Sequence, residues 1–120
     1  MNLAKIMVFV PDIAEAKRFY SEVLGFELRT ENDKRLVFAH ESCDFIAHKC
    51  DKPTSSGDYA REARAVFVFC VPDIEKAIEA LRSRGVRVLH STPGQSEDGR
   101  YAAFVDPFGI VHEIFERHAT

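Results

Sequence analysis

A duplicated pattern constrains this chain more than any other feature of its sequence. The tetrapeptide VPDI occurs at residues 10–13 and again at 71–74, so 61 positions separate the two copies in a chain of 120 residues. Each copy follows a short run of β-branched and aromatic residues and precedes a stretch with apolar residues at helical spacing. The pattern therefore predicts two copies of one structural module.

Each module is predicted to be a strand, a helix and three further strands. Each helix follows an aspartate suited to N-capping, Asp12 or Asp73, and ends before Gly25 or Gly85, where left-handed backbone is favoured. A proline ends the strand before each helix, because it cannot donate to a sheet ladder. The strands are predicted at residues 3–10, 26–30, 35–40 and 44–50 in the first half, and at 66–71, 86–90, 101–105 and 110–115 in the second.

The predicted architecture is an α+β fold made of two βαβββ modules. We expect one domain over residues 1–120, composed of a first module at 1–50, a polar linker at 51–63 and a second module at 64–120. The linker, and a second loop at 91–99, are rich in polar and breaker residues and could fold over a site. A helix covers only one face of each sheet, so we expect the two sheets to form a curved mixed sheet that encloses a groove.

Composition excludes several functional classes. The net charge is −3 and the basic residues are interspersed with acidic ones, which does not fit a nucleic-acid partner. The apolar runs are far shorter than the roughly 18–20 residues that span a bilayer, and the N-terminus lacks the order of a secretion signal. Three cysteines without a C-x-x-C spacing suit a reducing compartment. We expect a cytoplasmic protein with neither a membrane nor a nucleic-acid partner.

Three segments carry a family resemblance. VPDIAEAKRFYSEVLGF, VPDIEKAIEALRSRGV and DPFGIVHEI resemble the opening, middle and closing signatures of the glyoxalase / bleomycin resistance protein / extradiol dioxygenase superfamily, also called the vicinal oxygen chelate superfamily. The resemblance implies paired βαβββ modules around a groove, a small-molecule ligand and a homodimer. It also implies, in metal-dependent members, a divalent metal held by four side chains. Known activities range from glyoxalase-type lyase and isomerase chemistry to dioxygenation and metal-free drug binding.

The resemblance places the four metal positions on residues that are mostly unable to bind a metal. The first falls on Lys5, whose ammonium has no lone pair, and the third falls on Val66, which has no donor atom. The fourth falls on Glu113, which is retained. A gap-free count puts the second on Ala47; a shift by one residue would select His48, which alternation turns to the other face unless a bulge intervenes. We therefore expect no family metal site; a divalent metal, if bound, would use Glu113 and His48.

Lys5 and Glu113 occupy positions that converge on one metal in the family. We therefore expect an ammonium–carboxylate pair in its place, formed within or between chains. In the alternative interpretation, Lys5 extends into solvent and Glu113 is an ordinary strand-end carboxylate. Glu113 is also the one candidate catalytic residue.

Strand alternation predicts which side chains face the groove. The ligand-binding candidates are Lys5, Met7, Phe9, Val66, Val68, Cys70, Tyr101, Val111, Glu113 and Phe115. This mostly apolar set suits a small amphipathic or aromatic molecule, although the same residues could instead pack against each other or against a partner chain. We interpret Cys70 as a buried apolar residue, and His40, His90, His112 and His118 as solvated.

Three functions remain open from the sequence. The favoured one is a small-molecule-binding protein with an apolar groove and without the family metal site. The second is a metal-dependent glyoxalase-like lyase or isomerase with an altered ligand set. The third is an interaction module whose groove is filled by its own side chains.

Overall fold

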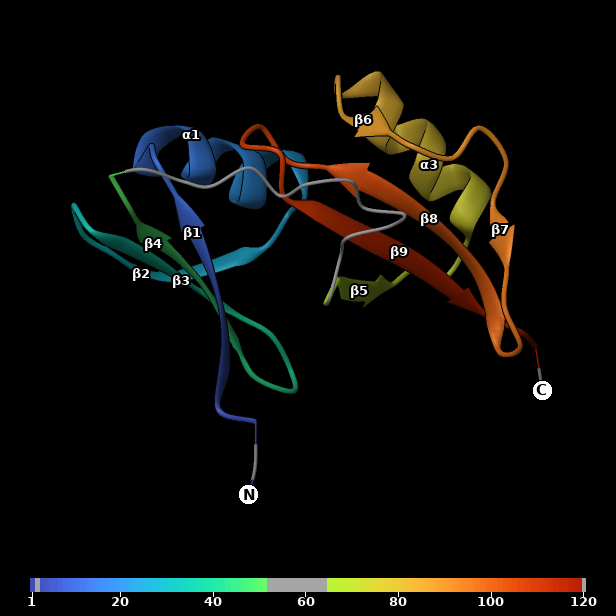
Figure 1. Ribbon diagram of the computed structural model, residues 1–120, viewed down its shortest axis with the longest axis horizontal. Helices are drawn as coiled ribbons and strands as arrows, with labels where there is room; N and C mark the ends of the chain where they lie inside the picture. The colour runs from blue at the N-terminus through green and yellow to red at the C-terminus, as the bar shows by residue number, and fades with distance from the viewer. Residues whose placement is uncertain (2, 52–64, 120) are drawn as a thin grey trace. The chain divides into compact units, whose positions relative to one another are not determined.

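The structure is a computed structural model that describes residues 1, 3–51 and 65–119 (Figure 1). The chain divides into two compact units, Met1–Thr54 and Ser55–Thr120. This division falls within the predicted linker 51–63, of which residues 52–63 lie outside the described residues. That the two modules form one domain stays a prediction. Among the described residues, no helix has the length and apolarity needed to cross a membrane.

The first unit has the predicted order of one strand, a helical segment and three strands. Its elements are β1 (Lys5–Val10), α1 (Ile13–Lys17), η1 (Arg18–Val23), β2 (Glu27–Glu31), β3 (Arg35–Ala39) and β4 (Asp44–Lys49). They form a four-stranded sheet in the order β1-β4-β3-β2, in which β1 and β4 are parallel and the other neighbours are antiparallel. A parallel pair of first and last strands needs a crossover, and the helical segment is part of it.

The helical segment of the first unit begins where the sequence predicts and then departs from a regular α-helix. The Asp12 side chain accepts a hydrogen bond from the Glu15 amide at 3.0 Å, as an N-cap does. After Lys17 the chain continues as a π-helix, η1. The Ser21 hydroxyl donates to the Lys17 carbonyl at this junction. Apolar spacing alone does not distinguish this wider turn from an α-helix.

The core of the first unit is largely aromatic. Tyr20 lies at its centre, and its ring centroid is 5.2 Å from that of Phe45 and 5.9 Å from that of Phe38. All three side chains are almost completely buried. The core lies between η1 and the sheet, so the helical segment is held to β3 and β4 by burial of large apolar surface.

The second unit repeats the plan with one added strand. Its elements are β5 (Phe67–Cys70), α3 (Ile74–Ser83), β6 (Arg87–Val88), β7 (Gly94–Gln95), β8 (Gly99–Val105) and β9 (Val111–Arg117). The sheet order is β5-β9-β8-β6, and β7 pairs with β8. Strands β5 and β9 are parallel, as β1 and β4 are in the first unit. The prediction of two βαβββ modules is confirmed.

Three of the differences from the predicted boundaries in the second unit bear on the site. The segment 91–99, predicted to be a loop, contains β7, which pairs with β8 through Gly94 and Gln95. Strand β9 continues to Arg117, two residues beyond the predicted end. Val66, predicted to begin a strand, lies just before β5. Strand β7 and the extension of β9 both arise from pairing with β8, because a neighbouring strand can stabilise residues whose own β propensity is low.

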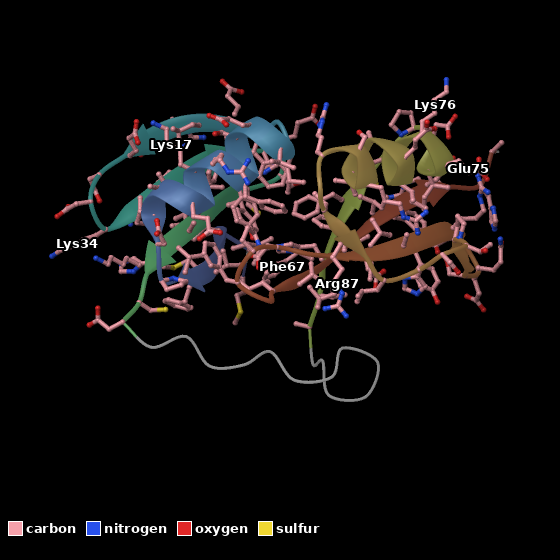
Figure 2. All side chains as sticks on the ribbon, turned by 90° about the horizontal axis from the view of Figure 1, so that it is seen from above. Lys17, Lys34, Phe67, Glu75, Lys76 and Arg87 are labelled. Carbon is pink, nitrogen blue, oxygen red and sulfur yellow. The ribbon has the colours of Figure 1, made fainter. Side chains whose placement is uncertain are left out.

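The start of α3 is fixed to the end of the sheet by polar contacts. Asp73 caps the helix by accepting from the Lys76 amide at 3.1 Å, and the Glu116 carboxylate accepts from the Ile74 amide at 2.9 Å. The Arg100 guanidinium donates hydrogen bonds to the carboxylates of Glu116, at 2.8 Å, and Glu75, at 2.6 Å. The hydrogen bonds from Arg100, and then from the Ile74 amide, lower the pKa of the Glu116 carboxyl. Figure 2 shows Glu75 projecting outward from α3, so this contact lies at the surface.

His112 corrects the prediction of a solvated histidine. Its side chain is fully buried, and its ring centroid lies 5.4 Å from that of Phe104 and 5.7 Å from that of Phe69. It pairs with Phe67 in the ladder, on the face of β9 opposite that of Glu113. Burial lowers the pKa of His112 to about 4, because an apolar environment disfavours the charged imidazolium.

Candidate functional site

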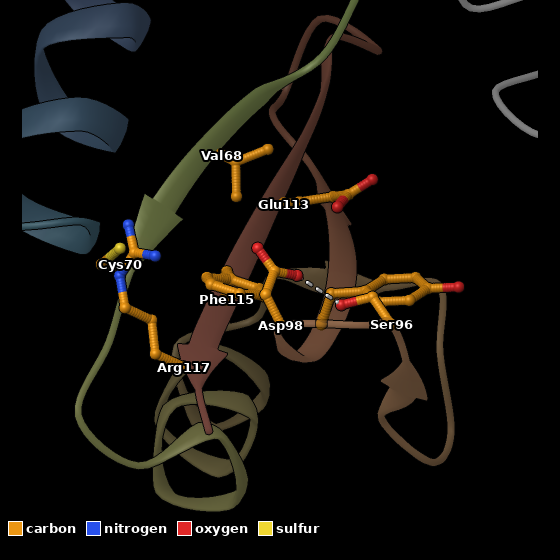
Figure 3. Close-up of a pocket in the computed structure, with 8 residues that line it drawn as sticks. Val68, Cys70, Ser96, Asp98, Glu113, Phe115 and Arg117 are labelled. Carbon is orange, nitrogen blue, oxygen red and sulfur yellow. Dashed lines mark hydrogen bonds between the residues drawn. The ribbon is translucent and has the colours of Figure 1, made fainter. Parts of the chain in front are cut away.

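A depression of about 520 Å³ lies on the second unit, on the sheet face opposite that of His112 (Figure 3). Its wall and floor come from β5, β8, β9 and the turn between β7 and β8. The residues that line it are Val68, Cys70, Ser96, Asp98, Tyr101, Glu113, Phe115 and Arg117. The depression therefore combines apolar and aromatic side chains with two carboxylates, one guanidinium and two hydroxyls.

Strand register brings these residues together. In the parallel pair of β5 and β9, Val68 lies opposite Glu113 and Cys70 lies opposite Phe115. In the antiparallel pair of β8 and β9, Tyr101 lies opposite Phe115. Residues directly opposite each other project on the same face of a sheet. Cys70, Phe115 and Tyr101 thus form one row across three strands, and Val68 and Glu113 belong to the next row.

Two glycines let the aromatic rings lie close to the sheet. A Cβ atom at Gly94 would overlap the ring of Tyr101 and would lie 2.7 Å from its Oη. A Cβ atom at Gly99 would lie 2.8 Å from the ring of Phe115. Because neither glycine has a side chain, Tyr101 can cover β7 and Phe115 can cover β8. His90 packs edge-on against Tyr101, with ring centroids 5.3 Å apart. We call Phe115 and Tyr101 the aromatic floor.

Opposite charges line the depression without pairing with each other. The Asp98 carboxylate accepts a hydrogen bond from the Ser96 hydroxyl at 2.9 Å. The Arg117 guanidinium carbon lies 5.7 Å from the centroid of the Phe115 ring, within the range of a cation–π contact. Both residues belong to the described part of the chain, and no ion pair joins them. In Figure 3, Arg117 and Ser96 lie on either side of Phe115.

The structure brings five of the predicted groove residues around the depression. They are Val68, Cys70, Tyr101, Glu113 and Phe115. Val66 and Val111 are half-buried and do not line it. Lys5, Met7 and Phe9 lie on β1 in the other unit, where Phe9 is 55% exposed. Cys70 is exposed, which corrects the interpretation of a buried apolar residue.

Three lining residues were not predicted. Arg117 continues the alternation of Glu113 and Phe115 along β9, so the signal was present, but the predicted strand ended at Phe115. Ser96 and Asp98 belong to the segment that the sequence presented as a loop. Only the pairing of β7 with β8 carries them to the depression.

The register also corrects the second metal position implied by the resemblance. Met7 and Val68 each lie three residues before the valine of a VPDI motif. Val68 is paired with Glu113, and Met7 is paired with Ile46. Ile46 is therefore the counterpart of Glu113, and its side chain has no donor atom.

Neither Ala47 nor His48 occupies that position. Ala47 is paired with Val8, and both are buried on the side of the core. His48 is paired with Phe9, its ring centroid lies 6.1 Å from that of Phe9, and it shares the face of Lys5 and Met7. The gap-free count that selects Ala47 is valid only if the two modules have loops of equal length. The parallel ladder identifies the paired residues directly. Alternation therefore does not turn His48 away from the face of Lys5.

The donor set does not fit the metal site that the resemblance implies. Of the four positions Lys5, Ile46, Val66 and Glu113, only Glu113 has an atom that binds a cation at neutral pH. Tight binding of a zinc-type divalent cation usually takes three or four such ligands from the protein. Within residues 1, 3–51 and 65–119, no three His, Cys, Asp or Glu side chains are grouped closely enough to hold a metal ion. The expected pairing of Lys5 with Glu113 joins residues of different units and stays a prediction.

Comparisons with known proteins agree with this architecture. The sequence profile of the Glyoxalase/Bleomycin resistance protein/Dioxygenase superfamily matches residues 2–114. Among curated protein sequences, none matches this chain.

Solved structures resemble the chain over nearly its whole length. A glyoxalase family protein from Enterococcus faecalis has a TM-score of 0.79 at 24% identity, with 96% of this chain and 97% of that chain covered. The fosfomycin resistance protein FosX from Listeria monocytogenes has a TM-score of 0.79 at 16% identity, with coverages of 98% and 94%. TnmS3, an antibiotic-binding protein from a Streptomyces species, has a TM-score of 0.67 at 24% identity, with coverages of 98% and 99%. At these identities the likeness shows a shared fold.

Proposed function

The chain belongs to the Glyoxalase/Bleomycin resistance protein/Dioxygenase superfamily, and on this premise we propose that it binds a small aromatic or amphipathic molecule without the family metal. The binding surface is the depression on the second unit. The aromatic floor and Val68 supply apolar contact, and the charged and hydroxyl side chains at its margin supply orientation. Ligand sites in proteins commonly combine these two kinds of group.

The single observation that carries this proposal is the exposed apolar surface of the depression. Val68 is 49% exposed on a sheet face, although valine in a sheet usually packs into a core. It lies in the same depression as the aromatic floor. A ligand that covered this surface would remove apolar area from water, which is worth roughly 25 cal/mol per Å² before the costs of binding.

The donor set favours binding over metal-dependent chemistry. A lyase or isomerase of the glyoxalase type would need a ligand set that Lys5, Ile46 and Val66 do not provide. The antibiotic-binding protein TnmS3 shares the fold, so a binding role is compatible with this architecture.

A probe titration tests the proposal. We expect 2-(2-naphthyl)ethanol, a neutral aromatic probe, to bind with a measurable dissociation constant and to raise the melting temperature. Its fluorescence can be followed without tryptophan background, because the chain contains no tryptophan. Val68→Asn should weaken binding about tenfold, since it replaces exposed apolar surface in the depression with an amide. Leu89→Asn is the matched control, because Leu89 is also exposed, at 37%, and lies outside the depression.

Two results would contradict the proposal. One is a probe that binds equally to the Val68 and Leu89 variants, which would place binding elsewhere. The other is a stoichiometric divalent metal in the purified protein whose removal by EDTA lowers the melting temperature. That result would favour the metal-dependent lyase or isomerase.

A further inference from the structure

Two of the three charged side chains that line the depression, Asp98 and Arg117, are held apart by separate contacts. Ser96 binds the Asp98 carboxylate on the turn between β7 and β8, at 2.9 Å. Phe115 holds the Arg117 guanidinium over its ring at the end of β9. Oppositely charged side chains at the margin of one small depression could pair with each other, but these two, both among the described residues, do not.

The Arg117 guanidinium and the Asp98 carboxylate bind ligand groups of opposite charge. A guanidinium presents planar donors that match a carboxylate or a similar oxyanion. A carboxylate accepts hydrogen bonds from an ammonium group. The aromatic floor lies in the same depression; Tyr101 is half-buried and exposes part of its ring to a planar group, whereas Phe115 is 9% exposed and lies beneath Arg117.

We propose that the depression selects a small aromatic zwitterion, a molecule that carries an oxyanion and an ammonium group beside a planar ring. The ring lies on the aromatic floor, the oxyanion binds Arg117 and the ammonium binds Asp98. This inference rests on the proposed function and specifies its ligand class. It does not use Glu113, so it is independent of the predicted pairing of Glu113 with Lys5.

Four naphthalene probes of similar size test the two charges separately. They are 3-(2-naphthyl)alanine as zwitterion, 3-(2-naphthyl)propionate as anion, 2-(2-naphthyl)ethylamine as cation and 2-(2-naphthyl)ethanol as neutral reference. We expect the zwitterion to bind most tightly. Each single-charge probe should bind about fivefold more weakly than the zwitterion, as expected for loss of one exposed charge contact. Raising the salt concentration should reduce this preference.

Two variants assign each charge to its partner. Arg117→Gln should remove the advantage of the zwitterion over the cation, and Asp98→Asn should remove its advantage over the anion. Circular dichroism spectra and melting temperatures compare the folding of both variants with that of the parent. Arg87→Gln and Glu97→Gln are the matched controls, because both side chains are exposed and lie outside the lining of the depression.

The outcomes separate this inference from the proposed function. If no probe binds, the proposed function fails and this inference fails with it. If the neutral probe binds as tightly as the zwitterion, the proposed function stands and the charge selection is overturned. If only one of the two charges changes affinity, or if the control variants change it equally, the zwitterion class is overturned.

Discussion

At the scale of single residues, His112 links burial to the effect of pH on stability. Its pKa of about 4 lies below the ordinary value of 6.5 because the side chain is buried. The unfolded chain therefore binds a proton that the folded chain does not bind between these two values. Protonation of His112 has little effect on stability above about pH 7, and it destabilises the fold increasingly as the pH falls toward 4.

We expect His112 to lower the free energy of unfolding by about 2 kcal/mol between pH 7 and pH 5. Urea unfolding at both pH values measures this change. His112→Leu should reduce the pH dependence by about that amount. A His112 pKa near 6.5, measured by NMR titration of the folded protein, would refute the prediction.

At the scale of elements, the start of α3 shows how one helix is fixed to its sheet. The Asp73 side chain satisfies the amide of Lys76, and the Glu116 carboxylate satisfies the amide of Ile74. Two of the four amides that a helix leaves unpaired at its start are therefore bonded. One bond is local and visible in the sequence, and the other comes from β9.

The local bond can be tested by itself. We expect Asp73→Ala to lower the free energy of unfolding by about 1 kcal/mol, because the Lys76 amide loses its acceptor. Asp73→Asn should change it by much less, since the amide oxygen of asparagine can still accept the hydrogen bond. Urea unfolding compares the two variants, and equal losses would show that the charge of Asp73, rather than its role as acceptor, stabilises the helix.

At the scale of the whole molecule, the family resemblance assigns residues of both units to one set of metal positions. Lys5 and Glu113 occupy two positions that the family uses for one metal, and they belong to different units. We expect their side chains to pair, within one chain or between the chains of the predicted homodimer. A double-mutant cycle of Lys5→Met and Glu113→Gln, measured on the free energy of unfolding, should give a coupling energy of about 0.5 kcal/mol or more.

The same cycle can locate the pair. A coupling that disappears when the protein is diluted until sedimentation shows monomers would place Lys5 and Glu113 on different chains. A coupling that persists would place them on one chain. Pairing Lys5→Met with Glu41→Gln is the control, because Glu41 is an exposed residue of the first unit. A coupling no larger than that of the control would exclude the pair.

Much of the fold was predictable because its signals are local. Asp12 and Asp73 cap their helices, and alternation along β9 identified Glu113 and Phe115 as neighbours on one face. The duplicated VPDI, with the glycine that follows each helix, predicted both modules. Proline, aspartate and glycine each restrict the backbone conformation at their own positions.

The sequence by itself determined the two βαβββ modules and the family, and it placed Lys5 and Val66 at two of the family's four metal positions. Only the tertiary structure decided that Ile46 is the counterpart of Glu113, that His112 is buried, and that Ser96, Asp98 and Arg117 join the depression. The physical reason is that caps and turns depend on a few neighbouring residues. Ladder register and the packing of side chains depend on strands that are distant in the sequence.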